Sequence, residues 1–216
     1  DDFAEPMVTI GDADSAALTA ALRLKRRDPD RVRITVFTVA GSGAHPVLRA
    51  ALARGADEAM HLAIAADPNG GDPQHDARYV ARAVAGALRR SPADLVICGD
   101  SAADTNQGAV PTYLSAGLDI PLFRDIDRLD WSDSGEPGLR LGASAWQGQR
   151  IDQPLPCVIA TTAADESAGD SFGIVDWLGA ERREITEIPA ASLVSDLVPL
   201  EVRHVRRAST GGGDAG

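Results

Sequence analysis

The sequence predicts an α/β fold built around a mainly parallel sheet, with helices on both faces of the sheet. Three observations predict it. Up to Pro121, short apolar runs rich in β-branched residues alternate with segments of helical spacing. One such run, in residues 94–121, ends in a loop of small and polar residues that opens a helix. Beyond that loop, two extended segments flank a turn rich in Gly and Pro, which favours an antiparallel hairpin.

The elements expected before Pro121 follow from apolar spacing and turn residues. Asp12 or Asp14 can cap a first helix that runs to Lys25. The other helices are expected at residues 46–54, 76–90 and about 107–117. Strands are expected at residues 32–39, 58–64 and 95–98. Helices that alternate with strands in this way predict a doubly wound sheet of the Rossmann-like, adenine-nucleotide-binding kind.

The second half of the chain predicts the hairpin and an arm. Residues 122–131 and 139–147 are expected to pair as the antiparallel hairpin, and residues 157–161 to rejoin the sheet. A short helix is expected at residues 174–182. We interpret residues 1–193 as one nucleotide-binding domain, 194–208 as a C-terminal arm for partner contact and 209–216 as a flexible tail.

Charge and cysteine content exclude several kinds of partner. The net charge of −11 repels nucleic acid and anionic lipid headgroups. No apolar run is long enough to cross a bilayer, so we expect no membrane-embedded segment. The two cysteines, Cys98 and Cys157, lie in apolar strand-like runs, where thiols behave as small hydrophobes. This setting fits a reducing compartment and predicts a cytoplasmic protein.

Several segments, taken in order, resemble one family. They are residues 47–57 (VLRAALARGAD), 93–99 (ADLVICG), 117–121 (GLDIP), 155–160 (LPCVIA) and the closing 205–208 (VRRA). Their order and spacing resemble those of the β subunit of electron transfer flavoproteins. Each motif alone is common, so the resemblance depends on their succession along most of the chain. The departures from the usual pattern, given below, identify a divergent member.

The resemblance implies an electron-transport role. The family's β subunit forms a heterodimer with an α subunit that holds most of the FAD. The pair passes electrons from acyl-CoA or other flavin dehydrogenases to a quinone oxidoreductase or another acceptor. The β subunit is then a carrier without catalytic residues of its own, and it commonly holds AMP. The alternative is a stand-alone adenine-nucleotide-binding module of regulatory or stress type, and a hydrolase on the same kind of sheet is a more distant possibility.

The resemblance also implies a nucleotide site at the ends of two strands. Its residues would be Val39, Ala40, Gly41, Gly99, Asp104, Thr105, Asn106, Gln107, Gly108, Ala109 and Val110. The loop departs from the family pattern, because Pro111 removes a backbone donor and no Lys or Arg lies in the loop to offset a phosphate charge. Both an AMP-filled site and an empty, structural turn therefore stay open.

A second implied site is a docking segment for partner dehydrogenases. By resemblance, Ile174 occupies the position of an apolar anchor, and Phe172 and Trp177 flank it. Apolar side chains of this size are costly to expose without a partner. For Trp177, we favour the alternative in which the ring packs inward as ordinary core.

Two further features predict little chemistry. His45, His61, His75 and His204 are scattered without metal-ligand spacing, so no metal site is predicted. The family's opening strand is missing or reduced to residues 7–10. A sheet without it would have a gap at its most buried position, so we expect a further strand before Asp1.

Overall fold

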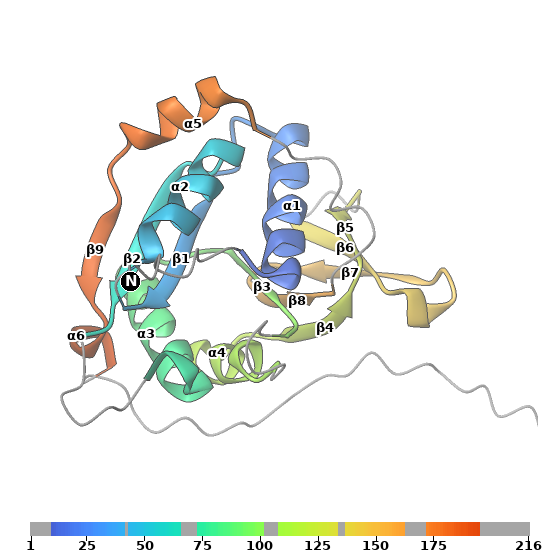
Figure 1. Cartoon of the computed structure of the whole chain (residues 1–216). Helices are drawn as coiled ribbons and strands as arrows, with labels where there is room; N and C mark the ends of the chain where they lie inside the picture. Colours follow the sequence, from blue (N-terminus) through green and yellow to red (C-terminus); the bar gives the residue numbers. More distant parts are fainter. Residues whose placement is uncertain are drawn as a thin grey trace, which may run out of the picture.

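The computed structural model describes residues 10–41, 43–65, 73–101, 108–133, 137–162 and 172–194. Its elements, in chain order, are α1 (Asp12–Arg27), β1 (Thr35–Ala40), α2 (Ala44–Arg54), β2 (Glu58–Ala63), η1 (Pro73–His75), α3 (Ala77–Arg90), β3 (Leu95–Gly99), α4 (Val110–Leu118), β4 (Leu122–Ile126), β5 (Arg128–Trp131), β6 (Gly138–Gly142), η2 (Ser144–Trp146), β7 (Arg150–Pro154), β8 (Cys157–Thr161), α5 (Ile174–Glu181), β9 (Thr186–Pro189) and α6 (Ala191–Val194). Figure 1 shows their arrangement.

In the described part of the chain, the strands form two parallel sheets and one antiparallel sheet, each with three strands. The first parallel sheet has the order β1-β2-β9, and the second has the order β3-β8-β4. The antiparallel sheet has the order β5-β6-β7. This mixture of parallel strands, alternating helices and an antiparallel unit confirms the predicted α/β class.

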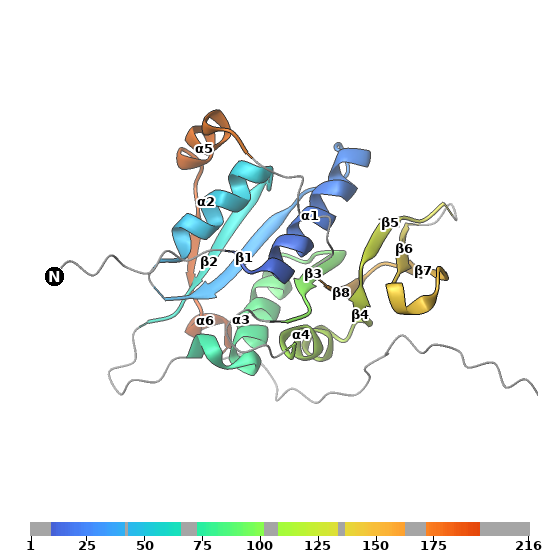
Figure 2. The same cartoon turned by 45° about the vertical axis from the view of Figure 1, so that its right-hand side comes forward.

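Helices cover both faces of the first parallel sheet, as a doubly wound fold requires. Ala59 of β2 packs with residues of α2 on one face, whereas Leu62 packs with residues of α3 on the other. The two views agree in placing α1 and α2 on one side of the strands and α3, α4 and α6 on the other (Figures 1 and 2). The chain therefore buries its parallel strands between two helical layers.

The two parallel sheets meet at a break. Among the described residues, no ladder joins β1 to β3. All six residues of β1 are only half-buried. On the β3 side of the break, the Gly99 N–H at the end of β3 donates to Asp14 Oδ1 of α1 over 3.3 Å. In a continuous sheet, the carbonyl of a neighbouring strand would accept this hydrogen bond. Residues 7–9, most of the short apolar run that precedes α1, lie outside the described residues.

Two predicted boundaries were wrong for local physical reasons. The cap of α1 is Gly11 rather than Asp12 or Asp14, because both carboxylates lie within the first turn and Asp14 accepts from Gly99 instead. Helix α4 begins at Val110 rather than near residue 107. Pro111 then falls in the first turn, where a missing N–H has no intrahelical partner to lose.

The predicted hairpin was partly wrong. Residues 122–131 do not form one strand: β4 pairs in parallel with β8, and β5 pairs antiparallel with β6. The register of β4 shifts between Phe123 and Ile126, and Asp125 adopts a left-handed φ of 58°. This kink lets neighbouring strands enter different sheets. A third strand, β7, extends the hairpin, and residues 144–146 form η2 instead of a strand.

Candidate functional site

The strand ends that the sequence singles out lie at one edge of the molecule. Helix α1 begins beside the end of β3, through the contact of Asp14 with Gly99, and its last turn reaches the start of β2, where Lys25 Nζ donates to Asp57 Oδ1 over 2.6 Å. Since β1 is parallel to β2, the carboxyl ends of β1 and β3 lie at the α1 N-terminal edge. Ligands of α/β sheets bind at such an edge.

The structure describes part of the predicted nucleotide site. Val39 and Ala40 close β1, and Gly41 follows at once. Gly99 closes β3, and Gly108 and Ala109 lead into α4 at Val110. Asp104, Thr105, Asn106 and Gln107 lie outside the described residues. The described members thus come from both sides of the break between the sheets, and their role in binding stays a prediction.

An arginine that the sequence analysis did not select holds the loop between β3 and α4. The Arg124 guanidinium, on β4, donates to the Gly108 carbonyl over 2.8 Å and to the Asp100 carbonyl over 3.4 Å. It also donates to Thr112 Oγ1 over 3.3 Å. The loop itself has no basic residue, so this cation supplies a positive charge from a neighbouring strand. Arg124 is the first basic residue after Arg90, a signal that the sequence does offer.

Gly108 lies close against Asp100 and Arg124. A Cβ at Gly108 would lie 1.9 Å from the Asp100 carbonyl oxygen and 2.4 Å from Arg124 Nη2. Any side chain there would force backbone apart, so only glycine fits the observed closure. Ala109, the residue before α4, makes no side-chain capping bond. The N–H groups of the first turn of α4 therefore have no side-chain cap from this residue.

The two thiols at the strands are not poised for chemistry. Both cysteines are free. Burial raises the pKa of each thiol to about 12, and the nearby Asp14 carboxylate adds to the rise at Cys98. A thiol with so high a pKa stays protonated at neutral pH and is a poor nucleophile.

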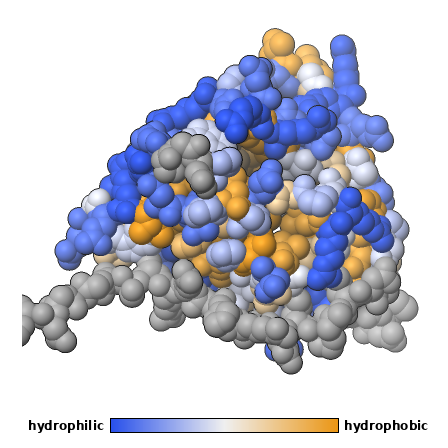
Figure 3. Space-filling model, turned by 180° about the vertical axis from the view of Figure 1, so that it is seen from behind, coloured by the Kyte–Doolittle hydropathy of each residue, from blue (hydrophilic) through white to orange (hydrophobic). Residues whose placement is uncertain are grey.

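The docking segment predicted around Ile174 is an exposed apolar helix. Ile174 and Val175 in the first turn of α5 are 76% and 77% exposed, and Leu178 is 56% exposed. Hydrophobic residues gather at the top of Figure 3, where Figure 1 places α5. Trp177 is half-buried and stacks on Phe172, with ring centroids 5.8 Å apart. The two aromatic rings thus shield each other, while the aliphatic side chains face solvent.

Arginines anchor the opposite end of α5. Arg49 of α2 donates to the carbonyls of Ala180 and Arg183, and Arg183 donates to the carbonyls of Ala56 and Asp57. The buried Ala180 packs in the same cluster as residues of α2. The helix is therefore fixed at its C-terminal end and presents its N-terminal turn outward.

A cleft of about 740 Å³ contains none of the predicted site residues in its lining. It runs between α1 and the antiparallel sheet, and its basic lining residues are Arg23, Arg27, Arg128, Arg140 and Arg150. Arg27 is paired with Asp130 over 2.5 Å, and Arg140 with Asp152 over 3.2 Å. The sequence analysis missed this cleft because its arginines come from four separate elements.

No helix in the described ranges combines the length and the apolar character needed to traverse a bilayer.

Comparison with known proteins gives a consistent family signal. The family described as the electron transfer flavoprotein domain matches residues 6–193. The electron transfer flavoprotein subunit beta of Megasphaera elsdenii is 29% identical over 197 residues, which cover 85% of this chain and 67% of that protein.

Two further relatives agree. A candidate electron transfer flavoprotein subunit of Escherichia coli strain K12, YgcR, is 29% identical over 207 residues, covering 92% of this chain and 74% of that protein. The electron transfer flavoprotein subunit beta of Bacillus subtilis strain 168 is 32% identical over 117 residues, covering 54% of this chain and 43% of that protein. The matched family range contains every described residue of the predicted nucleotide and docking sites.

Proposed function

This chain belongs to the electron transfer flavoprotein family, and from that premise we propose that it is the β subunit of a heterodimeric electron carrier. An α subunit would hold most of the FAD, and the β subunit would complete the flavin environment. Electrons would pass from acyl-CoA or other flavin dehydrogenases to a quinone oxidoreductase or another acceptor. The flavin would carry the redox chemistry, so this subunit needs no catalytic residues of its own.

The observation that carries the proposal is the length of the family match. It runs from residue 6 to residue 193, across both parallel sheets and the antiparallel sheet. A stand-alone nucleotide-binding module would need only the parallel sheets and their helices. A protein that pairs with others has a use for the antiparallel sheet, the exposed α5 and the C-terminal arm, of which residues 195–208 lie outside the described residues. We also assign the complex to the cytoplasm, in keeping with its free cysteines.

The test is co-expression with an electron transfer flavoprotein α subunit. We expect a stoichiometric yellow complex whose visible spectrum is that of bound flavin, while the chain alone is poorly stable. Size-exclusion chromatography with absorbance detection measures both. If the chain is a stable, colourless monomer that does not bind the α subunit, the proposal is overturned and the stand-alone module is favoured.

The nucleotide site is proposed for AMP. The backbone N–H groups at the start of α4 and the Gly99 and Gly108 turns would face the phosphate, and Arg124 would offset its charge. Val39, Ala40 and Gly41 would face the adenine. Asp104, Thr105, Asn106 and Gln107 would complete the loop.

Denaturing the complex and separating the released nucleotides by chromatography tests this part. We expect one AMP per complex in the wild type and at least about tenfold less after Gly108→Ala, since the added Cβ must displace the Asp100 carbonyl. Gly179→Ala is the matched control, because a Cβ at Gly179 would meet nothing within 4 Å and its φ is not left-handed. FAD in place of AMP would change the ligand but keep the site, whereas an empty wild-type site would remove the claim.

The docking site is proposed on the first turn of α5. Ile174 would insert into a partner dehydrogenase, with Phe172 and Trp177 as supporting rings. We expect Ile174→Ala to slow electron transfer from the dehydrogenase while leaving the flavin spectrum unchanged. Ile151→Ala is the control, since Ile151 is a 40% exposed isoleucine on β7 of the antiparallel sheet. Equal slowing by both variants would contradict a localised anchor.

A further inference from the structure

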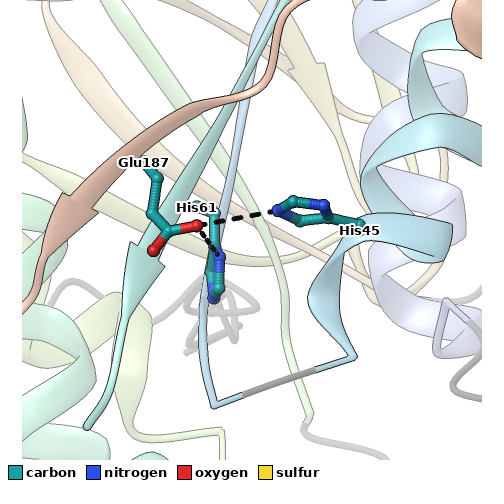
Figure 4. Close-up of side chains that lie close together, drawn as sticks. All are labelled: His45, His61 and Glu187. Atoms are coloured by element: carbon teal, nitrogen blue, oxygen red, sulfur yellow. Dashed lines mark ion pairs between the residues drawn. The ribbon is translucent and has the colours of Figure 1, made fainter.

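Three side chains that are far apart in the sequence converge on one face of the first parallel sheet. They are His45, His61 and Glu187, and their nearest ligand atoms all lie within 4.8 Å of one another. Glu187 Oε2 lies 3.5 Å from His61 Nδ1 and 3.8 Å from His45 Nε2. Figure 4 shows both imidazoles turned toward the same carboxylate oxygen.

The topology explains why these residues meet. His61 of β2 and Glu187 of β9 are direct register partners on neighbouring parallel strands, so their side chains project from the same face. His45 lies in the first turn of α2, the helix that packs on that face. Sequence spacing could not reveal the cluster, because all strands of the second sheet lie between β2 and β9 in the sequence.

The hydrogen bond of His61 fixes its proton. Its Nε2 lies 2.9 Å from the Ala40 carbonyl oxygen, and a carbonyl can only accept, so Nε2 carries the hydrogen. In the neutral ring Nδ1 then holds a lone pair, and it is aimed at a carboxylate oxygen that can also only accept. The His61 side chain is 7% exposed, and Nδ1 is buried without a hydrogen-bond partner in the described part of the chain.

A cation placed between two facing acceptors satisfies both of them. The donor set of two imidazole nitrogens and one carboxylate oxygen is one that zinc-type divalent ions prefer over Mg²⁺ or Ca²⁺. Ligand atoms about 2.0–2.2 Å from a tetrahedral ion lie roughly 3.3–3.6 Å apart. The carboxylate oxygen lies 3.5 Å and 3.8 Å from the two imidazole nitrogens, close to that range. A metal-binding imidazole also characteristically donates its other N–H to a backbone carbonyl, as His61 does to Ala40.

We propose that His45, His61 and Glu187 bind a divalent transition-metal ion of the zinc class, with the remaining coordination positions taken by water. His45 and Glu187 are 55% and 57% exposed, which gives the ion a path from solvent. The bound ion ties α2, β2 and β9 together at one point. Through the His61 ring the ion also connects to Ala40, whose carbonyl accepts both from His61 Nε2 and from the Ile64 N–H that follows β2.

The experiment uses the full chain without a polyhistidine tag, stripped of metal with a chelator and titrated with Co²⁺. We expect saturation at one Co²⁺ per chain, a visible ligand-field absorption band, and displacement of that band by one equivalent of Zn²⁺. Zinc should also raise the thermal midpoint of the chain by a few degrees, since it binds only the folded form.

Two variants and a control make the assignment specific. Glu187→Gln keeps the shape of an exposed side chain, and we expect it to weaken Co²⁺ binding at least about tenfold and to abolish the thermal shift. His61→Gln should do the same. His75→Asn, which removes a histidine from η1, should bind like the wild type.

The contrary results are equally defined. A wild-type chain that binds Co²⁺ no more tightly than Glu187→Gln would overturn the metal site and would leave His61 as a doubly protonated partner of Glu187. Equal loss of binding in His75→Asn would show adventitious binding to surface histidines and would also overturn it.

Discussion

The second parallel sheet buries all five residues of its middle strand, β8, whereas the first leaves all six residues of β1 half-exposed. Around β8 the contacts are apolar, with Val158 and Ile159 completely buried. Around the first sheet, polar contacts link the elements as well. Lys25 of α1 pairs with Asp57, and Arg49 and Arg183 donate to backbone carbonyls. The second sheet thus has a fully buried middle strand, whereas the first sheet adds directed polar bonds at its ends and edges to its apolar clusters.

The largest expected effect tests the packing side of this comparison. Val158→Ala removes two methyl groups from a fully buried site, so we expect a loss of about 2–3 kcal/mol in the free energy of unfolding. Val36→Ala removes the same atoms from half-buried β1 and should cost about 1 kcal/mol or less. Urea unfolding of the full chain, followed by tryptophan fluorescence, measures both. Equal losses would break the comparison.

A middle-sized effect tests the polar side. Arg183→Ala removes the guanidinium that joins the segment before β9 to the Ala56 and Asp57 carbonyls, and we expect a cost of about 1–2 kcal/mol. The neighbouring Arg182 is exposed, so Arg182→Ala should change stability by less than about 0.5 kcal/mol. Hydrogen exchange at β9 amides should rise in the Arg183 variant. Unchanged exchange there would mean that packing alone retains β9.

The smallest effect is a pH dependence at Asp57. Burial raises the pKa of this carboxyl, but the Lys25 ammonium and the Ile34 amide outweigh burial and lower the pKa below its usual range. A lowered pKa in the folded state means that the stabilisation is full above the unfolded-state pKa and is lost as pH falls through the folded-state value. Lys25→Met should therefore cost about 0.5–1 kcal/mol at pH 7 and clearly less near pH 3.

A matched pair checks that assignment. Asp28 and Arg31 form a pair in which the Arg31 side chain is 75% exposed, so Arg31→Met should have little effect at either pH. Thermal midpoints of the three proteins at both pH values give the comparison. A Lys25→Met cost that stays constant down to pH 3 would show that the lysine acts through its bond to the Gly55 carbonyl rather than through the Asp57 carboxylate.

Local pattern was enough to predict most of the fold. The strand at residues 58–64 and the helix at 76–90 are confirmed as β2 and α3, because both have strong periodicity and clear turn residues. Strand β9 was not predicted, since its four residues include Glu187 and end in Pro189 at a sheet edge. Strand β7 was missed because its residues are mostly polar and exposed.

The candidate sites show the same limit. The exposed position of Ile174 agrees with the predicted docking segment, although its role stays a prediction. Arg124 and the His45, His61 and Glu187 cluster were beyond the reach of sequence spacing, because each depends on which strand lies beside which. A local pattern predicts elements, whereas these contacts depend on the order of strands in a sheet.

The order β1-β2-β9 has a consequence for how this protein is made. The strands of the second parallel sheet all lie between Leu95 and Thr161, inside the excursion that the chain makes between β2 and β9. During synthesis the second sheet can therefore form before β9, the third strand of the first sheet, has been synthesised. Since β9 begins only at Thr186, the ribosome must release nearly the whole domain before the first sheet is complete. Until then the unpaired edge of β2 can pair with strands of other chains. The pairing of β9 with β2 covers this edge and so prevents such association.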